Sequence, residues 1–207
     1  MHRPTQIMER ALRKAGLTVI AGCDEAGRGA WAGPLVAAAV VLPENVRLPG
    51  VRDSKLLSER QRERLYGMIT NKALAWNAAI ITAECIDKHG VHKANLAALC
   101  QAVAELPVRA EHALIDTFHV ETMPCPSTSV LHGDRNVLSI AAASVLAKVT
   151  RDRIMIELHE LFPQYGFVRH KGYGTKQHQQ ALERFGPTPL HRTSFAPIAR
   201  LAVLRAM

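Results

Sequence analysis

Residues 22–40 read GCDEAGRGAWAGPLVAAAV, and this stretch decides how the rest of the chain is interpreted. Two adjacent acids, Asp24 and Glu25, follow an apolar run, and a glycine-containing loop separates them from a second apolar run at 35–42, which Pro43 closes. Short apolar runs bounded by glycine and proline are typical of buried strands. The stretch therefore predicts a strand, an acidic turn, a flexible loop and a return strand.

The two acids are unusual, because neighbouring carboxylates at the end of a buried strand repel each other unless a cation lies between them. Adjacent strand residues point to opposite faces, so we expect the chain to leave the strand near Glu25, at a bend that Gly27 permits. The pair could bind a metal ion or take part in catalysis, or it could be a solvated turn. The loop Gly27-Arg28-Gly29 suits a phosphate or a sugar, because glycines let the backbone approach a ligand closely.

The chain of 207 residues has 48% hydrophobic and 21% charged residues, which is ordinary for one globular domain spanning 1–207. Its apolar runs are far shorter than the roughly 20 residues of a membrane-spanning helix. The N-terminus lacks a secretory signal, and a mitochondrial presequence is a weaker interpretation of it. We therefore expect a cytoplasmic protein without a membrane partner. The net charge of +8 hints at a polyanionic partner. Reduced thiols are expected at Cys23, Cys85, Cys100 and Cys125, whose spacing fits neither zinc nor redox motifs.

Periodicity and capping signals predict alternating strands and helices, hence an α/β fold. The expected strands are at 19–23, 35–42, 73–81, 112–116 and 129–131. The expected helices are at 7–15, from the capping box Ser58-Gln61 onward, and at 82–89, 92–105, 138–161 and 175–185.

Two further acids occupy informative positions. Asp116 ends an apolar strand, much as Asp24 follows one. If the two strands are parallel neighbours, Asp24, Glu25 and Asp116 converge at the carboxyl edge of the sheet, where ligands gather in open α/β folds. Asp134 precedes the long helix at 138–161, where it could belong to the same site or be an anion favoured by the helix dipole.

The chain becomes basic from about residue 165 to residue 207, and its cations alternate with aromatic residues. This composition is typical of segments that contact a nucleic-acid backbone or single nucleotides. We therefore expect the segment to be a substrate-binding part of the domain.

Several motifs together resemble the ribonuclease HII family, from about residue 18 to about residue 197. In order, they are DEAGRG at 24–29, GP at 33–34, DSK at 53–55, Asp116, GD at 133–134, AAAS at 141–144, AKVTRD at 147–152, KGYGT at 171–175 and HRTSF at 191–195.

The resemblance implies a ribonuclease-H-like mixed β-sheet flanked by helices, with a C-terminal helical extension. It implies an endonuclease that hydrolyses the RNA strand of RNA–DNA hybrids and incises duplex DNA at single embedded ribonucleotides. Such an enzyme leaves 5′-phosphomonoesters and serves ribonucleotide excision repair. By the same resemblance, Gly27-Arg28-Gly29 would contact the ribose 2′-hydroxyl, and Tyr173 would pack on the following deoxyribose. The implied cofactor is Mg²⁺ or Mn²⁺, held by Asp24, Glu25, Asp116 and Asp134.

The chemistry of phosphodiester hydrolysis agrees with that assignment. Two divalent ions about 4 Å apart can activate the attacking water and stabilise the leaving oxygen. Ions of this kind prefer carboxylate oxygens, and four acids without a cysteine or histidine cluster suit them better than zinc. We assign Lys55, Lys148 and Lys171 to phosphate contacts, with a solvated surface charge as the alternative for each. His191 could shuttle a proton or be a core or surface histidine.

The sequence departs from the family pattern at three positions. Ala30 replaces a usual proline, Trp31 follows it, and Thr117 stands where glycine is frequent. These changes could alter the rigidity of the loop and the turn after the strand. Rival interpretations are a junction resolvase or strand-transfer enzyme of the ribonuclease-H-like group, and a basic nucleic-acid-binding module with a structural ion. We expect a monomer, while the preferred ion and docking on a replication clamp stay open.

Overall fold

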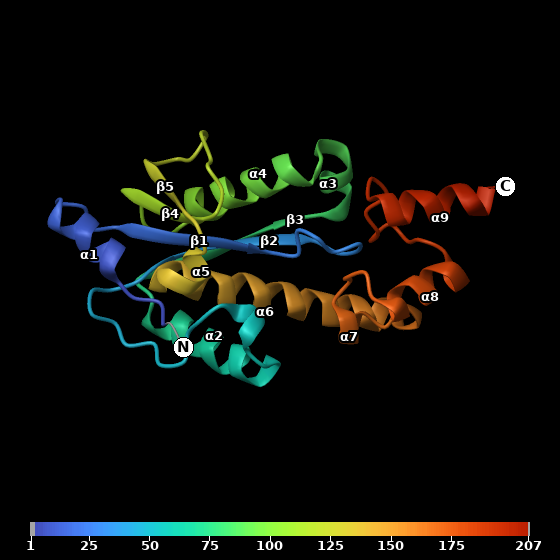
Figure 1. Ribbon diagram of the computed structural model, residues 1–207, viewed down its shortest axis with the longest axis horizontal. Coiled ribbons are helices and arrows are strands. Elements are labelled where there is room, and N and C mark those ends of the chain that lie inside the picture. Colours follow the sequence, from blue (N-terminus) through green and yellow to red (C-terminus); the bar gives the residue numbers. More distant parts are fainter. Residues whose placement is uncertain (1–2, 207) are drawn as a thin grey trace.

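The computed structural model describes residues 3–206, with side chains to residue 201. Five strands form one mixed sheet in the order β3-β2-β1-β4-β5 (Figure 1). The strands are β1 (Ile20–Ala26), β2 (Leu35–Val41), β3 (Ala75–Ile81), β4 (His112–Asp116) and β5 (Ser127–Val130). β1 pairs antiparallel with β2 and parallel with β4, β3 pairs antiparallel with β2, and β5 pairs parallel with β4.

Helices cover both faces of the sheet, and a helical part extends beyond one end of it (Figure 1). The α-helices are α1 (Ile7–Lys14), α2 (Glu59–Lys72), α3 (Ala83–His89), α4 (Val91–Ala104), α5 (Gly133–Asn136), α6 (Leu138–Leu161), α7 (Phe167–His170), α8 (Lys176–Phe185) and α9 (Ala196–Ala206). Short 3₁₀ turns are η1 (Ser54–Leu56) and η2 (Pro163–Tyr165). α4 packs on one face of the sheet, α6 on the other with α2 against it, and α7 to α9 form the extension. The predicted mixed sheet with flanking helices and a C-terminal helical extension is confirmed.

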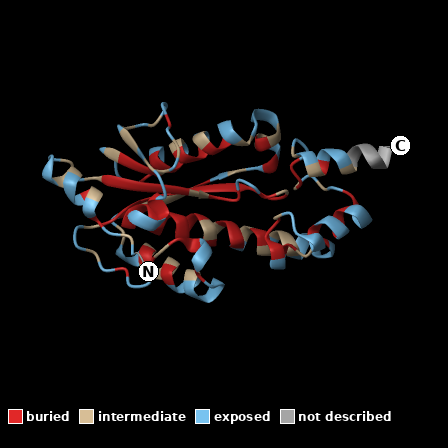
Figure 2. Ribbon diagram, viewed as in Figure 1, coloured by how far each residue is buried: buried red, intermediate tan, exposed pale blue. Residues whose placement is uncertain are grey.

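The contact between β1 and α6 determines the position of the candidate site. The alanine-rich first half of α6 is buried, as are β1 and β2 (Figure 2). Gly22 of β1 lies directly on the backbone of Ser139, where any Cβ would overlap it. Glu9 of α1 accepts a hydrogen bond from the Ser139 N–H at 3.0 Å, so a buried carboxylate satisfies one of the free amides at the start of α6.

Most predicted elements are present, with differences at their ends. β1 runs three residues past its predicted end at 23, because the pairs Glu25↔Ala37 and Ala26↔Val36 continue the ladder with β2 to Ala26. The chain then leaves the strand next to Glu25, at Gly27, which has a φ of +90°. The capping box of α2 is present as predicted, with Ser58 and Gln61 each bonding the other's backbone amide. β5 begins two positions before its predicted start.

Two further expectations concern the state of the cysteines and membrane-spanning helices. Each of the four cysteines has a free thiol, as predicted. Within residues 3–206, no helix combines the length and the apolar character needed to cross a membrane.

Candidate active site

Asp24 and Asp116 lie side by side at the carboxyl ends of parallel strands, as predicted. Cys23 of β1 is paired with Ile115 of β4, and each acid is the next residue on its strand. A third acid joins them through α5, because the Gly133 N–H donates to Asp116 Oδ1 at 2.7 Å. Asp134 therefore lies beside Asp116, within the short helix α5 and not as a cap of α6.

The adjacent acids of β1 face opposite sides of the sheet. Asp24 is buried on the α6 side, where the Ser144 hydroxyl stabilises its ionised form. Ser144 in turn lies 2.9 Å from the hydroxyl of Ser54, which joins the DSK motif to the site. Glu25 faces the α4 side near Asn95, and its buried Oε2 atom has no hydrogen-bond partner in the described part of the chain.

Burial and mutual repulsion raise the pKa values of Asp24 and Glu25. Burial, Glu25 and Asp116 raise the pKa of Asp24 well above its usual value. Burial and Asp116 raise the pKa of Glu25 to about 7, against the opposing effects of Arg28, Asn95 and Lys55. This edge of the sheet therefore carries more negative charge than the protein neutralises.

Asp134 and Lys55 belong to the same electrostatic group. Burial, Asp116 and Asp53 raise the pKa of Asp134. The ammonium of Lys55 is 3.7 Å from Asp134 Oδ2 on a side chain that is 77% exposed. Desolvation lowers the pKa of Lys55, but the surrounding acids raise it on balance. Lys55 is thus an exposed cation beside Asp134, at the solvent side of the acidic edge.

The acidic edge fits an oxygen-preferring divalent cation in its chemistry. Its donors are carboxylate oxygens, one of them buried without a partner among the described residues, and the raised pKa values of Asp24 and Glu25 mean that a positive charge would stabilise their ionised forms. Among the side chains that the structure describes, however, no three of His, Cys, Asp or Glu are placed closely enough to form a ready-made metal site. Metal binding by Asp24, Glu25, Asp116 and Asp134 stays a prediction.

The glycine loop after β1 is rigidly anchored at its base and open at its tip. Gly27 has a φ of +90°, and a Cβ there would overlap the Arg151 side chain. Gly29 is exposed, and a Cβ there would meet nothing within 4 Å. Arg28, between them, is exposed and lies over the ring of Phe118 at 4.9 Å. The tip of the loop can therefore accept a ligand without rearranging.

Two fully buried arginines anchor this loop, and neither was assigned a role from the sequence. Arg151 of α6 donates to the carbonyl oxygens of Pro34 at 2.8 Å and Ala32 at 3.1 Å. Arg192 donates to those of Gly33 and Arg28, both at 2.9 Å. Burial lowers the pKa of both groups, that of Arg192 to about 9. The available signal was their place inside the motifs AKVTRD and HRTSF.

Tyr173 belongs to a second loop that docks on the glycine loop. The Trp31 N–H donates to the Gly172 carbonyl at 2.8 Å, and a Cβ on Gly174 would overlap the Trp31 ring. The Tyr173 ring is half-buried, with the Arg151 guanidinium 5.1 Å and the Lys148 ammonium 5.5 Å from its centroid. Trp31, a departure from the family pattern, is thus the residue that joins the two loops.

The lysines assigned to phosphate contacts differ in their surroundings. Lys148 donates to Asp152 at 2.6 Å and is mostly buried, whereas the Lys55 side chain is mostly exposed beside Asp134. Lys171 is buried and donates to the Val168 carbonyl at 2.5 Å. Phosphate binding stays a prediction for all three residues, and the geometry favours Lys55.

The basic C-terminal part divides into a buried and an exposed set. Buried cations and histidines pack in the extension and do not face solvent, namely His170, Lys171, His178, His191 and Arg192. Exposed cations of the described part are Arg169, Lys176, Arg184 and Arg200. The proton-shuttle alternative for His191 has no support here, because the ring is 1% exposed and lies far inside this core.

Thr117 occupies a position at which the family that this sequence resembles often has glycine. Its φ is +60°, an uncommon conformation for a β-branched residue. Its N–H donates to the Val130 carbonyl at 2.9 Å, and its own carbonyl accepts from Ser129 Oγ at 2.8 Å. These bonds to β5 keep the turn after Asp116 in the shape that glycine would adopt.

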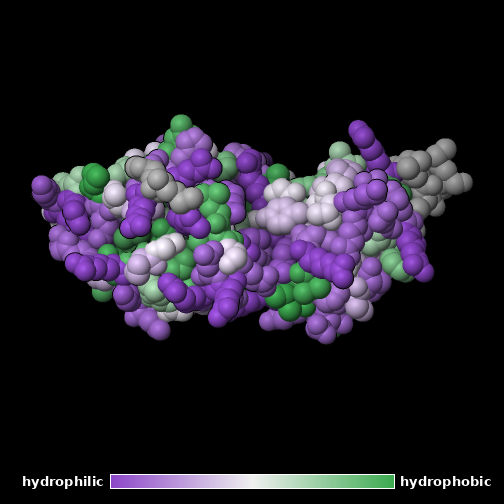
Figure 3. All heavy atoms as spheres, turned by 60° about the horizontal axis from the view of Figure 1, so that its bottom comes forward, coloured by the Kyte–Doolittle hydropathy of each residue, from purple (hydrophilic) through white to green (hydrophobic). Residues whose placement is uncertain are grey.

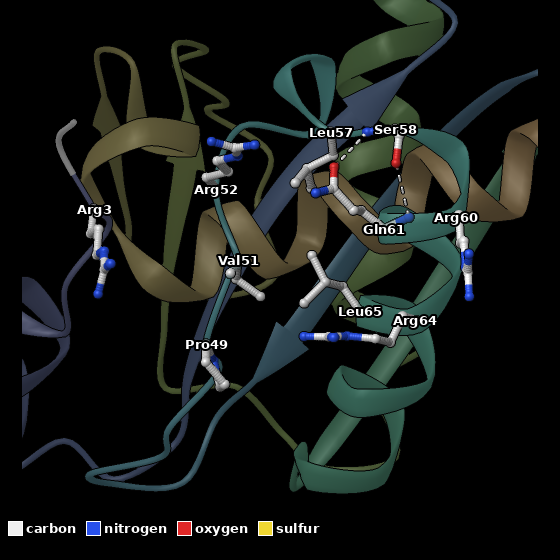
Figure 4. A pocket seen from close by; sticks show the side chains of 11 residues that line it. Arg3, Pro49, Val51, Arg52, Leu57, Ser58, Arg60, Gln61, Arg64 and Leu65 are labelled. Carbon is white, nitrogen blue, oxygen red and sulfur yellow. Dashed lines mark hydrogen bonds between the residues drawn. The ribbon is translucent and has the colours of Figure 1, made fainter.

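A separate hollow of about 700 Å³ lies between the 49–52 segment and α2. Figure 4 shows Val51, Leu57 and Leu65 pointing into it, and Figure 3 shows a mostly hydrophilic surface on the side of α2. The strand-end acids do not line this hollow, so it is distinct from the candidate site. Its cations are Arg3, Arg52, Arg60 and Arg64.

Residues 21–198 match the family model described as ribonuclease HII. A ribonuclease HII of Bacillus thuringiensis (strain Al Hakam) is 52% identical over 190 residues, which are 92% of this chain and 74% of that protein. A ribonuclease HII of Bacillus cereus (strain 03BB102) matches to the same extent.

Solved structures show the same fold. The crystal structure of ribonuclease H2 from Pyrococcus horikoshii OT3 matches with a TM-score of 0.78 and 25% identity, over 90% of this chain and 98% of that one. A ribonuclease HII of Archaeoglobus fulgidus, solved in a complex with PCNA, has a TM-score of 0.75 and 26% identity, over 86% and 95%. A Bst-RNase HIII solved with Mn²⁺ has a TM-score of 0.75 at 18% identity, over 96% and 74%, which is similarity of fold alone.

Proposed function

Because this chain belongs to the ribonuclease HII family, we propose that it cuts the RNA strand of RNA–DNA hybrids and also incises duplex DNA at single embedded ribonucleotides. Family membership makes the chain a ribonuclease H endonuclease and a metal-dependent hydrolase. The proposal adds the single-ribonucleotide substrate, the two-ion mechanism and the residues that carry each role. We also propose that the protein acts in the cytoplasm as a monomer. Its proposed role there is the removal of ribonucleotides from DNA.

The acidic edge is the proposed place of cleavage. Asp24, Glu25, Asp116 and Asp134 would hold Mg²⁺ or Mn²⁺, and two such ions, when bound, supply Lewis acidity and an activated water for in-line hydrolysis. The partnerless Glu25 oxygen and the raised pKa values of Asp24 and Asp134 support this role. Lys55 would approach the phosphate that enters, because its long side chain is exposed beside Asp134.

The glycine loop is the proposed reader of the sugar. The 2′-hydroxyl is what distinguishes RNA from DNA at a given site. Gly29 leaves open space at the loop tip, while Arg151 and Arg192 hold the loop base in place. A rigid backbone that hydrogen-bonds a hydroxyl rejects the analogue without it, because its own polar groups are then left unpaired. Tyr173, docked beside this loop, would pack on the next sugar.

The observation that supports the function best is the spatial order of these parts. Asp24 and Glu25 are among the last residues of β1, Asp116 ends β4, and the anchored glycine loop follows β1 immediately, so the proposed cutting and sugar-reading groups are adjacent. A generic nucleic-acid-binding module would not require a partnerless buried acid beside such a loop.

The test uses duplex DNA with one ribonucleotide, an all-DNA duplex and a continuous RNA–DNA hybrid, each with Mg²⁺ or Mn²⁺. We expect a single cut at the ribonucleotide, cutting along the hybrid, no cut in DNA, and complete inhibition by EDTA. Asp24→Asn and Asp116→Asn should each reduce turnover by about 10³-fold, because each removes a metal-ligand charge, while binding is kept or tightened.

Glu44→Gln is the matched control, because Glu44 is an exposed acid outside the site. It should behave as the wild type. Near wild-type turnover of Asp116→Asn would contradict the assignment of the acids. Cutting of the hybrid without any incision at the single ribonucleotide would contradict the proposed substrate.

A further inference from the structure

Three buried histidines lie beneath the Tyr173 loop, outside the acidic edge. His170 ends α7, His178 lies in α8, and His191 precedes α9. Their residues are 8%, 0% and 1% exposed, and their rings pack against Phe167. Burial lowers the pKa of His178 and of His191 to about 4, so both rings are neutral at neutral pH. Neutral rings each carry one donor and one acceptor nitrogen.

The partners of two of these rings fix which nitrogen carries the proton. The Thr188 N–H donates to His191 Nδ1 at 2.9 Å, so that nitrogen is an acceptor and the ring proton is on Nε2. His178 Nδ1 is 3.0 Å from the Tyr173 carbonyl oxygen, which only accepts, so His178 carries its proton on Nδ1. His178 Nε2 is then an acceptor.

The two rings are joined through these complementary nitrogens. His191 Nε2 is 3.1 Å from His178 Nε2, and the assigned protons make His191 the donor and His178 the acceptor. One directed chain therefore runs from Thr188 through His191 and His178 to the carbonyl of Tyr173. All the hydrogen bonds of this chain are compatible with the same two tautomers, His191 protonated on Nε2 and His178 protonated on Nδ1.

The turn before Tyr173 needs such restraint. Lys171 and Gly172 both have positive φ angles, +50° and +80°, and this conformation is uncommon for a lysine. On the near side, the Gly172 N–H donates to His170 Nδ1 at 3.2 Å. The far side is held at the Tyr173 carbonyl, which accepts from His178 and from the Thr175 N–H at 2.8 Å.

We infer that His178, oriented by His191, is a positioning residue for Tyr173 and thereby for the recognition of the RNA–DNA junction. The half-buried Tyr173 ring has the Lys148 and Arg151 cations near it but no side-chain hydrogen bond to any of the residues that the structure describes, so its location depends on that of its backbone. His178 Nδ1–H fixes this backbone at the carbonyl. The inference rests on the proposed role of Tyr173 in packing on the sugar after the ribonucleotide.

Two substitutions at one position separate positioning from packing. His178→Asn puts an amide N–H near the place of Nδ1, so it can still bond the Tyr173 carbonyl, but it does not reach His191. His178→Gln reaches the place of Nε2, so it can still bond His191, but it leaves the Tyr173 carbonyl without this donor. Both remove the ring from the same core, and their unfolding temperatures provide the control for packing.

The measurement is the ratio of kcat/KM on duplex DNA with one ribonucleotide to kcat/KM on a continuous RNA–DNA hybrid. We expect His178→Asn to keep this ratio within about twofold of the wild type and His178→Gln to lower it about five- to tenfold, the effect of one lost hydrogen bond. Equal ratios in the two variants, whether both low or both unchanged, would overturn the inference.

Two further comparisons keep the test decisive. If His178→Gln does not fold, two variants of His191 replace it. His191→Gln keeps a donor toward His178 and should preserve the ratio. His191→Asn is too short to reach His178 and should lower the ratio. Equal ratios in that pair would overturn the inference as well. Tyr173→Ala tests the underlying function: an unchanged ratio there refutes junction reading by Tyr173, whereas a lowered ratio with no effect of His178→Gln refutes the positioning role alone.

Discussion

Gly27 and Gly29 are two positions apart but are required for different reasons. At Gly27 a methyl group would overlap buried Arg151, and φ is +90°, so Gly27→Ala should destabilise the fold by about 1–3 kcal/mol. At Gly29 a methyl group meets only open space, so Gly29→Ala should fold normally. We still expect it to lose at least about tenfold in kcat/KM at a single ribonucleotide, because it fills the space where the ribose would bind.

Urea unfolding and incision kinetics on the same preparations check both halves of this prediction. A Gly29→Ala protein with wild-type stability and wild-type incision would show that the loop tip does not approach the substrate. Gly27→Ala is the internal control, since it should shift the unfolding midpoint and Gly29→Ala should not.

Single residues differ in how far the sequence could predict them. Asp24 and Asp116 were predictable to lie together, because each follows an apolar run and parallel strands end at one edge of the sheet. Arg151 and Arg192 were not, because a buried guanidinium is recognised only when the carbonyls around it are placed by the fold. The conformation of Thr117 likewise depends on its bonds to β5.

At the scale of elements, the close contact of α6 with β1 depends on the missing side chain of Gly22. Gly22→Ala would push the Ser139 backbone away, and we expect a loss of about 2–4 kcal/mol, at or above the usual cost of overpacking, because backbone cannot rotate aside. Gly67→Ala in α2 is the matched control, since a Cβ there meets nothing within 4 Å. It should stabilise the protein by about 0.5–1 kcal/mol, because alanine favours the helix.

Chemical denaturation of both variants distinguishes close packing from a general intolerance of alanine at glycine positions. Equal, small effects at Gly22 and Gly67 would mean that α6 can move away from the sheet at little cost. Activity should fall with Gly22→Ala, because the displaced helix carries Ser144, which stabilises the ionised form of Asp24.

The elements were largely predictable because their signals are local. Capping residues such as Ser58, Thr82 and Thr175 mark the starts of α2, α3 and α8 in the sequence itself. The end of β1 was not predictable, because its last residues are held in the strand by pairing with β2, a tertiary interaction that local propensity does not report. The start of β5 depends on β4 in the same way.

At the scale of the whole molecule, the charge of +8 predicts salt-sensitive binding of RNA–DNA hybrids. Lys176→Ala, at an exposed position at the start of α8, should reduce the slope of log K against log salt by up to about 1. Lys171→Ala should change it less, because that ammonium is buried against Val168. Binding titrations from low to moderate salt measure these slopes.

The exposed Lys14 of α1 provides the control for net charge, since α1 and α8 lie at opposite ends of the molecule (Figure 1). Lys14→Ala should leave the slope unchanged. Equal effects of Lys14→Ala and Lys176→Ala would mean that total charge matters and that the C-terminal part has no special role in binding.

One helix, α6, contacts both the proposed cleavage site and the proposed sugar-recognition site. Ser144 in its buried half stabilises the ionised form of Asp24, and Lys148 and Arg151, further along, contact the Tyr173 ring. At 1.5 Å per residue, about 10 Å of continuous helix separates Ser144 from Arg151. With the proposed roles, α6 is a molecular ruler between the cut phosphate and the junction sugar. Such a ruler would measure along the backbone without reading the bases, so we expect incision at a ribonucleotide in any sequence context.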